Sequence, residues 1–209
     1  MPVVVVANPK GGVGKSTLAT NIAGYFASRG HTVALGDLDR QQSARLWLQL
    51  RPTSQPAIAP WHAEAESGVL DKLPKGTTHA VLDTPAGLQG AQLGQVLRQA
   101  SHIIVPLQAS VFDIFATRQF LDELAGMRRI GRVQVGLVGM RVDERTIAAD
   151  KLHEFVGGLG LPVLGQLRDT QNYVHLAAHG LTVFDVTPSR VARDLEQWQG
   201  ITAWLGAAG

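Results

Sequence analysis

The chain has 209 residues, enough for one domain, and with 45% apolar and 17% charged residues it can bury a core, which excludes disorder. Cysteine is absent, which excludes disulfides, thiolate zinc sites, iron–sulfur clusters and cysteine nucleophiles. The formal net charge of +2 is far from that of a dedicated nucleic-acid coat, so any polyanion binding has to come from a local patch.

Short apolar runs alternate with amphipathic stretches along the chain. Residues 3–7 form a β-branched run typical of a strand buried on both faces of a parallel sheet. Residues 16–29 predict a helix, which Gly30 ends. Further strands are predicted at residues 32–36, 79–82, 102–107, 133–139 and 162–167. Further helices are predicted at residues 43–50, 91–99, 110–125, 146–159, 170–179 and 188–205.

This alternation predicts βαβ units and therefore an α/β fold with a doubly wound, mainly parallel sheet flanked by helices. The stretch 52–60 is rich in proline and is interpreted as an interruption without a strand. No linker divides the chain, so we expect a single domain over residues 1–209.

The first residues lack the basic lead of a signal peptide, and no stretch approaches the roughly 18–20 uninterrupted apolar residues of a membrane span. The sequence therefore predicts a cytoplasmic location.

A glycine-rich run lies between the first predicted strand and the first predicted helix. It reads Lys10-Gly11-Gly12-Val13-Gly14-Lys15-Ser16-Thr17. Glycines let backbone N–H groups approach phosphate oxygens, and the following helix adds its N-terminal donors. Lys15 is expected to reach the β- and γ-phosphates of a nucleotide, and the Ser16 hydroxyl to ligate Mg²⁺. The alternative is a glycine-rich turn that binds nothing.

The run departs from the ordinary phosphate loop, because Pro9 stands at the place of the first glycine and Lys10 is an additional lysine. This resembles the deviant Walker A loop of the ParA/MinD family of P-loop ATPases. The resemblance implies an ATP-bridged homodimer in which Lys10 contacts phosphate across the interface, so that Lys10 acts with Lys15 in catalysis. The alternative for Lys10 is a solvated loop charge.

Two carboxylate segments extend the resemblance. Asp37-Leu38-Asp39 follows the second strand where the family has its first switch, with Arg40 at the place of the family's proline. The match implies that Asp39 orients or activates the attacking water and that Asp37 supports the metal; the alternative for both is a helix cap or turn. Residues 80–87 resemble the family's Walker B strand and second switch, which implies that Asp83 holds the Mg²⁺ shell; the alternative for Asp83 is a turn residue at the end of a strand. The implied magnesium set is therefore Ser16, Asp37, Asp39 and Asp83.

The last third also resembles the small partition ATPases. Gly165-Gln166-Leu167-Arg168-Asp169 stands where those proteins close the nucleotide pocket, and Met140-Arg141 stands where many relatives have Asn-Arg on the adenine side. The resemblance therefore implies that Met140 and Arg168 join the loop residues 10–17 as ATP contacts.

The final predicted helix has an apolar face, but its cations are balanced by acidic residues. Such a helix more often packs on its own domain than inserts into a membrane. The chain starts directly before its first strand, and on that ground it resembles the class without a helix-turn-helix extension, which binds DNA without sequence preference. The candidate DNA contacts are Arg128, Arg129, Arg132, Arg190 and Arg193. The alternative for each arginine is a solvated surface charge.

The resemblance as a whole implies a ParA-type ATPase that dimerises with ATP and Mg²⁺ and binds nucleoid DNA nonspecifically. A ParB-like or adaptor partner would stimulate its slow hydrolysis, and the cargo would be a plasmid, a chromosome region or a protein assembly. Two alternatives remain open: a MinD-like membrane-associated regulator, and a small-molecule kinase or synthetase on the same fold.

Overall fold

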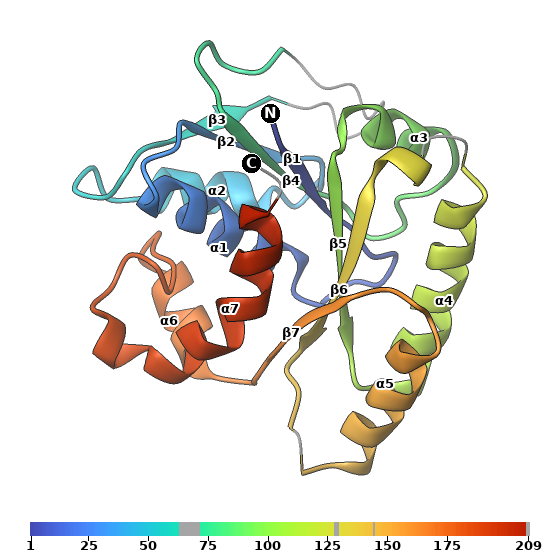
Figure 1. Cartoon of the computed structure of the whole chain (residues 1–209). Coiled ribbons are helices and arrows are strands. Elements are labelled where there is room, and N and C mark those ends of the chain that lie inside the picture. Colours follow the sequence, from blue (N-terminus) through green and yellow to red (C-terminus); the bar gives the residue numbers. More distant parts are fainter. Residues whose placement is uncertain (63–71, 128–129, 144, 208–209) are drawn as a thin grey trace.

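The computed structural model describes residues 1–62, 72–127, 130–143 and 145–207. In this part of the chain seven strands form one sheet in which all pairings are parallel (Figure 1). The strands are β1 Val3–Val6, β2 Val33–Asp37, β3 Ile58–Trp61, β4 His79–Asp83, β5 His102–Gln108, β6 Gln134–Met140 and β7 Val163–Leu167. Their order is β3-β2-β4-β1-β5-β6-β7. The predicted α/β fold with a doubly wound parallel sheet is thereby confirmed.

Helices cover both faces of the sheet, as Figure 1 shows. One face carries α1 Lys15–Ser28, α2 Ser43–Leu50, α6 Gln171–Ala177 and α7 Ala192–Gly206. The other face carries α3 Gly90–Gln99, α4 Val111–Ala125 and α5 Ile147–Gly157. None of the helices in the described ranges has the length and apolarity that a bilayer crossing needs.

The central strand β1 explains the β-branched run at the start of the sequence. It pairs with β4 on one side and with β5 on the other, so its backbone is enclosed. Val4 and Val6 pack into the core under α1 and α7, while Val3 and Val5 pack into the core under α3 and α4. Because successive side chains point to opposite faces, every position of this strand has to be apolar.

Strand β3 corrects the interpretation of the proline-rich stretch 52–60. It is an edge strand that pairs with β2, and its Ile58 and Trp61 are buried. Pro60 is tolerated because an edge strand has one side without ladder hydrogen bonds. The predicted helix 188–205 is also corrected, since a short 3₁₀ turn, η2 Pro188–Arg190, precedes α7.

Helix α7 turns its apolar residues inward. Trp198, Ile201 and Leu205 are all buried in the core, and the Trp198 indole donates a hydrogen bond to the Tyr173 hydroxyl at 2.9 Å. The helix therefore packs on its own domain, as its balanced charge indicates.

A histidine pair lies at the amino end of the sheet, where β4 begins. The rings of His31 and His79 have centroids 3.8 Å apart, and His79 also contacts Phe26. Burial lowers the pKa of His79 to about 4, with His31 and the N-terminal amino group acting in the same direction.

Because the pKa of His79 is lowered, we expect the protein to lose stability in acid. The unfolded chain binds this proton near pH 6.5, whereas the folded protein resists it down to a pKa of about 4, so the free energy of unfolding falls as the pH drops through this window. We expect His79→Gln to reduce the loss between pH 7 and 5 by about 1 kcal/mol, a value discounted for partial exposure. Urea unfolding at both pH values measures this, with His62→Gln as an exposed control. Equal losses in wild type and His79→Gln would refute it.

Candidate nucleotide-binding site

The glycine-rich run forms the loop between β1 and α1, at the carboxyl edge of the sheet. Gly12 and Gly14 have φ values of +74° and +95°, which favour glycine. A Cβ at Gly14 would also lie 2.6 Å from the terminal methyl carbon of Met140. Met140 is buried against the loop, so it supports the loop from behind. Its predicted contact with ATP stays a prediction.

Asn8 anchors the loop, and sequence analysis missed it. Its side-chain amide donates to the Pro106 carbonyl at 2.7 Å and to the Thr117 hydroxyl at 3.0 Å. Its Oδ1 accepts a hydrogen bond from the Lys10 backbone N–H at 2.8 Å. The one signal for this role is an asparagine directly after a buried apolar strand. A buried amide with its hydrogen bonds satisfied fixes the loop to β5 and α4.

Lys15 folds back onto the loop that precedes it. Its ammonium group donates to the Lys10 carbonyl at 2.7 Å, and its side chain is largely buried. Burial lowers the pKa of Lys15, while the carboxylates of Asp83 and Asp39 oppose the shift. The ammonium therefore lies among acceptors inside the loop, where a phosphate oxygen would be a stronger acceptor than a carbonyl.

Asp83 ends β4 and is 1% exposed. Neither carboxylate oxygen has a hydrogen-bond partner within normal distance among the described residues. Burial raises the pKa of Asp83 to about 7; the Ser16 hydroxyl and Lys15 oppose the shift, while Asp37 and Asp39 add to it.

These donors fit a magnesium ion. An unpartnered carboxylate close to a serine hydroxyl offers the hard oxygen ligands that Mg²⁺ prefers. No group of three or more acidic or histidine side chains suited to a metal occurs among the described residues. Mg²⁺ is commonly held by one or two protein ligands together with phosphate oxygens and water, so Ser16 and Asp83 suffice.

Asp37 and Asp39 have different environments. The Asp37 carboxylate accepts hydrogen bonds from the backbone N–H groups of Asp39 at 2.9 Å, Ala44 at 2.8 Å and Arg45 at 3.2 Å. Asp37 thus caps α2 and shapes the turn before it, which matches the cap alternative; metal support by Asp37 stays a prediction. Asp39 accepts a hydrogen bond from the Gln41 backbone N–H at 2.9 Å.

A cavity of about 330 Å³ opens above the loop. Its lining is Gly11, Gly12, Gly14, Lys15, Ser16, Thr17, Asp39, Gln41, Ser43, Ala86 and Arg141. The fold therefore brings Asp39 into one cavity with the loop, as the sequence predicts, whereas Lys10 is half-buried outside this lining and Val13 is buried. Arg141 was not predicted here; its φ of +52° is unusual for a residue with a side chain.

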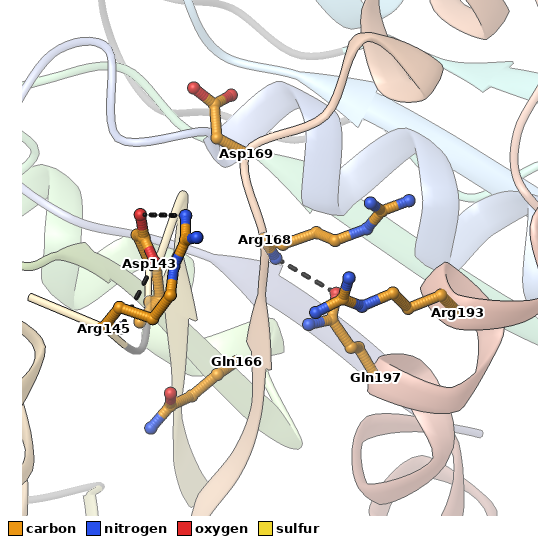
Figure 2. Close-up of a pocket in the computed structure, with 8 residues that line it drawn as sticks. Asp143, Arg145, Gln166, Arg168, Asp169, Arg193 and Gln197 are labelled. Atoms are coloured by element: carbon orange, nitrogen blue, oxygen red, sulfur yellow. Dashed lines mark hydrogen bonds and ion pairs between the residues drawn. The ribbon is translucent and has the colours of Figure 1, made fainter.

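A second cavity of about 400 Å³ lies next to the first, beyond the carboxyl ends of β6 and β7 (Figure 2). It is lined by Val142, Asp143, Arg145, Gln166, Arg168, Asp169, Arg193 and Gln197. The structure thus places Arg168 in this polar cleft and not among the residues that line the loop cavity.

The charges of the polar cleft are largely compensated. Arg145 pairs with Asp143 at 2.9 Å, and Arg168 pairs with the buried Asp194 at 2.8 Å. Gln166 and Gln197 add amide donors and acceptors. A neutral cleft of this kind suits a polar uncharged group such as a nucleobase better than a phosphate.

The predicted DNA contacts that lie within the described residues do not form one surface on the protomer. Arg132 ends η1 Ile130–Arg132, just before β6, whereas Arg193 lines the polar cleft beyond the other end of that strand. A strand of this length separates them by about 20 Å. Arg190 is exposed on η2, near Arg193 in the chain. Arg128 and Arg129 lie outside the described residues.

Comparisons with known proteins agree with the α/β fold described above. The family model of the CobQ/CobB/MinD/ParA nucleotide binding domain matches residues 4–183. The chain is 26% identical to the maintenance of carboxysome distribution protein A of Halothiobacillus neapolitanus, over 88% of this chain and 87% of that protein. It is 28% identical to the chromosome-partitioning ATPase Soj of Thermus thermophilus, over 71% and 73%. A variant of Cyanothece McdA in complex with ATP shares the fold, with a TM-score of 0.73 at 14% identity over 99% and 96%.

We expect the removal of the Asp83 charge to have opposite effects on the stability of the ligand-free fold and on the binding of Mg²⁺. Because burial raises the pKa of Asp83 from its ordinary value of 3.8 to about 7, the unfolded chain releases this proton first, and the free energy of unfolding of the ligand-free fold falls as the pH rises from about 4 to about 7. We expect Asp83→Asn to raise the free energy of unfolding at pH 8 by roughly 1 to 3 kcal/mol and by less at pH 5, where only part of the loss has occurred.

The same variant should lose the additional thermal stabilisation that Mg²⁺ gives together with ATP. Denaturant unfolding at pH 5 and 8, and melting curves with ATP in the presence and absence of Mg²⁺, measure both effects. An Asp83→Asn protein that is less stable at pH 8 would contradict the desolvation argument.

Proposed function

This chain belongs to the CobQ/CobB/MinD/ParA family of nucleotide-binding domains, and on that premise we propose that it is an ATP-driven dimerisation switch that positions a cargo. One observation carries the proposal: Asp39, Lys15 and Ser16 line one cavity, and the unpartnered Asp83 lies beside them. This arrangement can bind a triphosphate at the loop and place a carboxylate over its terminal phosphate.

The residues have separate tasks in the proposed hydrolysis of ATP. The loop N–H groups and Lys15 bind and orient the phosphates, and Ser16 and Asp83 would hold Mg²⁺, which neutralises phosphate charge when it is bound. Asp39 accepts a hydrogen bond from the Gln41 backbone and lines the cavity, so it can orient a water molecule and accept its proton. Lys10 contacts phosphate across the interface of the homodimer.

The polar cleft is the proposed place of the adenine base. It adjoins the loop cavity, because Arg141 lines the first and Val142 the second. Arg168 is fixed there by Asp194 and can present its guanidinium to a base. Met140 acts through Gly14, by supporting the loop from behind.

The proposed cargo follows the relatives. One is named for carboxysome distribution and another for chromosome partitioning, so a protein assembly, a plasmid or a chromosome region is proposed as cargo. We propose a cytoplasmic, nucleoid-associated dimer that binds DNA nonspecifically through Arg190 and Arg193. A ParB-like or adaptor partner would stimulate hydrolysis and release.

A small-molecule synthetase is the second candidate. The polar cleft of about 400 Å³ favours it, because a neutral cleft beside a nucleotide site can also hold a second substrate. Dimerisation that depends on ATP separates the two candidates, since the synthetase needs no such dimer.

The central test compares Lys15→Ala with Asp39→Ala. Lys15→Ala removes the cation at the phosphates and should weaken ATP binding at least about 100-fold. Asp39→Ala should bind ATP like wild type and accumulate as a dimer, because water activation is lost while the phosphate contacts remain. Titration with a fluorescent ATP analogue and size-exclusion chromatography with ATP and Mg²⁺ measure both. A monomeric Asp39→Ala protein that hydrolyses ATP normally would remove Asp39 from the mechanism.

DNA binding should depend on the nucleotide and on salt. Mobility shifts with random duplex should show binding with ATP and weak binding with ADP, because dimerisation doubles the number of arginines on one assembly. Exchanging Arg190 and Arg193 together for alanine removes four arginines from a dimer. The slope of log affinity against log salt should then fall by up to about 3.6, at 0.9 per contact.

Two further variants make the DNA test specific. Arg29→Ala is the matched control and should leave the slope unchanged, because Arg29 is an exposed arginine directly after α1. Arg132→Ala tests whether the arginine at the other end of the sheet also contacts DNA. Equal binding in ATP, ADP and no nucleotide would argue against the positioning switch and for the synthetase.

A further inference from the structure

The first turns of α4 turn apolar side chains outward. Val111, Phe112 and Phe115 are 60%, 79% and 67% exposed, while Asp113 and Thr117 on the same turns are buried. Further along α4 the usual pattern returns, with Phe120, Leu121 and Leu124 in the core. This reversal at one end of a helix is typical of a surface that another molecule covers.

A fourth side chain of the same kind lies at the start of the neighbouring helix. Ile147, the first residue of α5, is 79% exposed. Helices α4 and α5 cover the same face of the sheet and follow the adjacent strands β5 and β6, so both begin at its carboxyl edge (Figure 1). We call Val111, Phe112, Phe115 and Ile147 the α4–α5 patch.

The start of α4 is held to the phosphate loop by two hydrogen bonds. The Gln108 side-chain amide, three residues before α4, donates to the Gly12 carbonyl at 3.1 Å. The Asn8 amide, which also fixes Lys10, donates to the buried Thr117 hydroxyl on α4. The α4 part of the α4–α5 patch is therefore held in a fixed position relative to the loop.

We propose that a second copy of this chain covers the α4–α5 patch in the ATP-bound dimer. The inference rests on the proposed function, because it needs the face that carries the loop to meet its own copy. An isologous contact has to be self-complementary, and the four side chains of the patch carry no charge that would repel an identical patch. The α4 part of the patch also follows Gln108, whose side chain contacts the loop from which Lys10 is proposed to reach the partner's nucleotide.

The size of the patch explains why such a dimer would need nucleotide. A phenylalanine buries about 150–250 Å² at most, so four side chains per protomer supply only part of the roughly 1,200–2,000 Å² of a stable interface. The patch alone leaves the chain monomeric, and bridging phosphates alone leave a polar interface with little apolar core. Together they give a dimer that forms with ATP and dissociates after hydrolysis.

The first experiment removes the aromatic rings. Phe112→Ser/Phe115→Ser should weaken the dimer formed with a non-hydrolysable ATP analogue and Mg²⁺ at least about 100-fold in analytical ultracentrifugation, because central aromatic side chains dominate interfaces. ATP binding to the monomer and the melting temperature should stay unchanged, since both rings are exposed in the monomer. Val174→Ser is the matched control, because Val174 on α6 is 63% exposed and lies outside the patch.

The second experiment measures coverage directly. The chain has no cysteine, so Phe112→Cys creates a unique thiol. Its reaction with a maleimide should slow at least about tenfold in the ATP-bound dimer, because a buried thiol is not accessible to the reagent. The protection should disappear as dilution separates the protomers. Val174→Cys should react at the same rate in monomer and dimer.

The two experiments distinguish a wrong dimer surface from the absence of an ATP-dependent dimer. A wild type that dimerises with ATP, together with a Phe112→Ser/Phe115→Ser variant that does so equally well, overturns the inference and leaves the function standing. If that variant dimerises normally but loses stimulation by a partner protein, the patch belongs to the partner and the inference is wrong. A wild type that stays monomeric with ATP and Mg²⁺ overturns the proposed function and the inference together.

Discussion

Asp83 holds a carboxylate at the carboxyl edge of the central sheet, with no hydrogen bond within normal distance to either oxygen among the described residues. The parallel register pairs Asp83 with Val6 on one side and with Asp37 on the other, so the loop and the first switch converge on this residue. A buried carboxylate is costly unless a cation compensates it. Lys15 lies near Asp83, and its positive charge opposes the rise in the pKa of Asp83, although burial also lowers the pKa of Lys15 itself. The ligand-free site therefore carries an unfavourable desolvation free energy, which a bound metal with its nucleotide would offset.

A second constraint joins the switch to the C-terminal segment. Asp37 caps the start of α2, and Arg51 directly after α2 makes a buried bidentate pair with Asp185, with N–O distances of 2.9 and 3.0 Å. Asp185 in turn accepts hydrogen bonds from the backbone N–H and the hydroxyl of Thr182. Separating a buried ion pair costs about 3–5 kcal/mol, so α2 and residues 180–185 have to move as one body if the switch rearranges. Breaking the Asp37 cap would be the cheaper alternative.

The sequence predicts those parts of the fold and site that depend on local pattern. The bounds of α2 agree with the prediction, and the loop, Asp39 and Asp83 meet as expected, because β-branched strands and a glycine motif are local signals. The edge strand β3 was missed because it is short and contains proline, which argues against a strand. The role of Asn8 depends on contacts about one hundred residues away, which no local pattern indicates.

The arrangement of the arginines decides how such a protein would bind DNA. One protomer presents Arg190 and Arg193 at the carboxyl end of the sheet and Arg132 at the other, too far apart to follow one short stretch of duplex together. Arg193 also lies beside a cleft whose other arginines are already paired with aspartates. Within the part of the chain that the structure describes, a monomer therefore offers few arginines in one place, and a twofold copy is the simplest way to increase them. Under the proposed function, affinity for DNA would depend on the dimer, and the dimer would depend on how the phosphate loop and the start of α4 are held together.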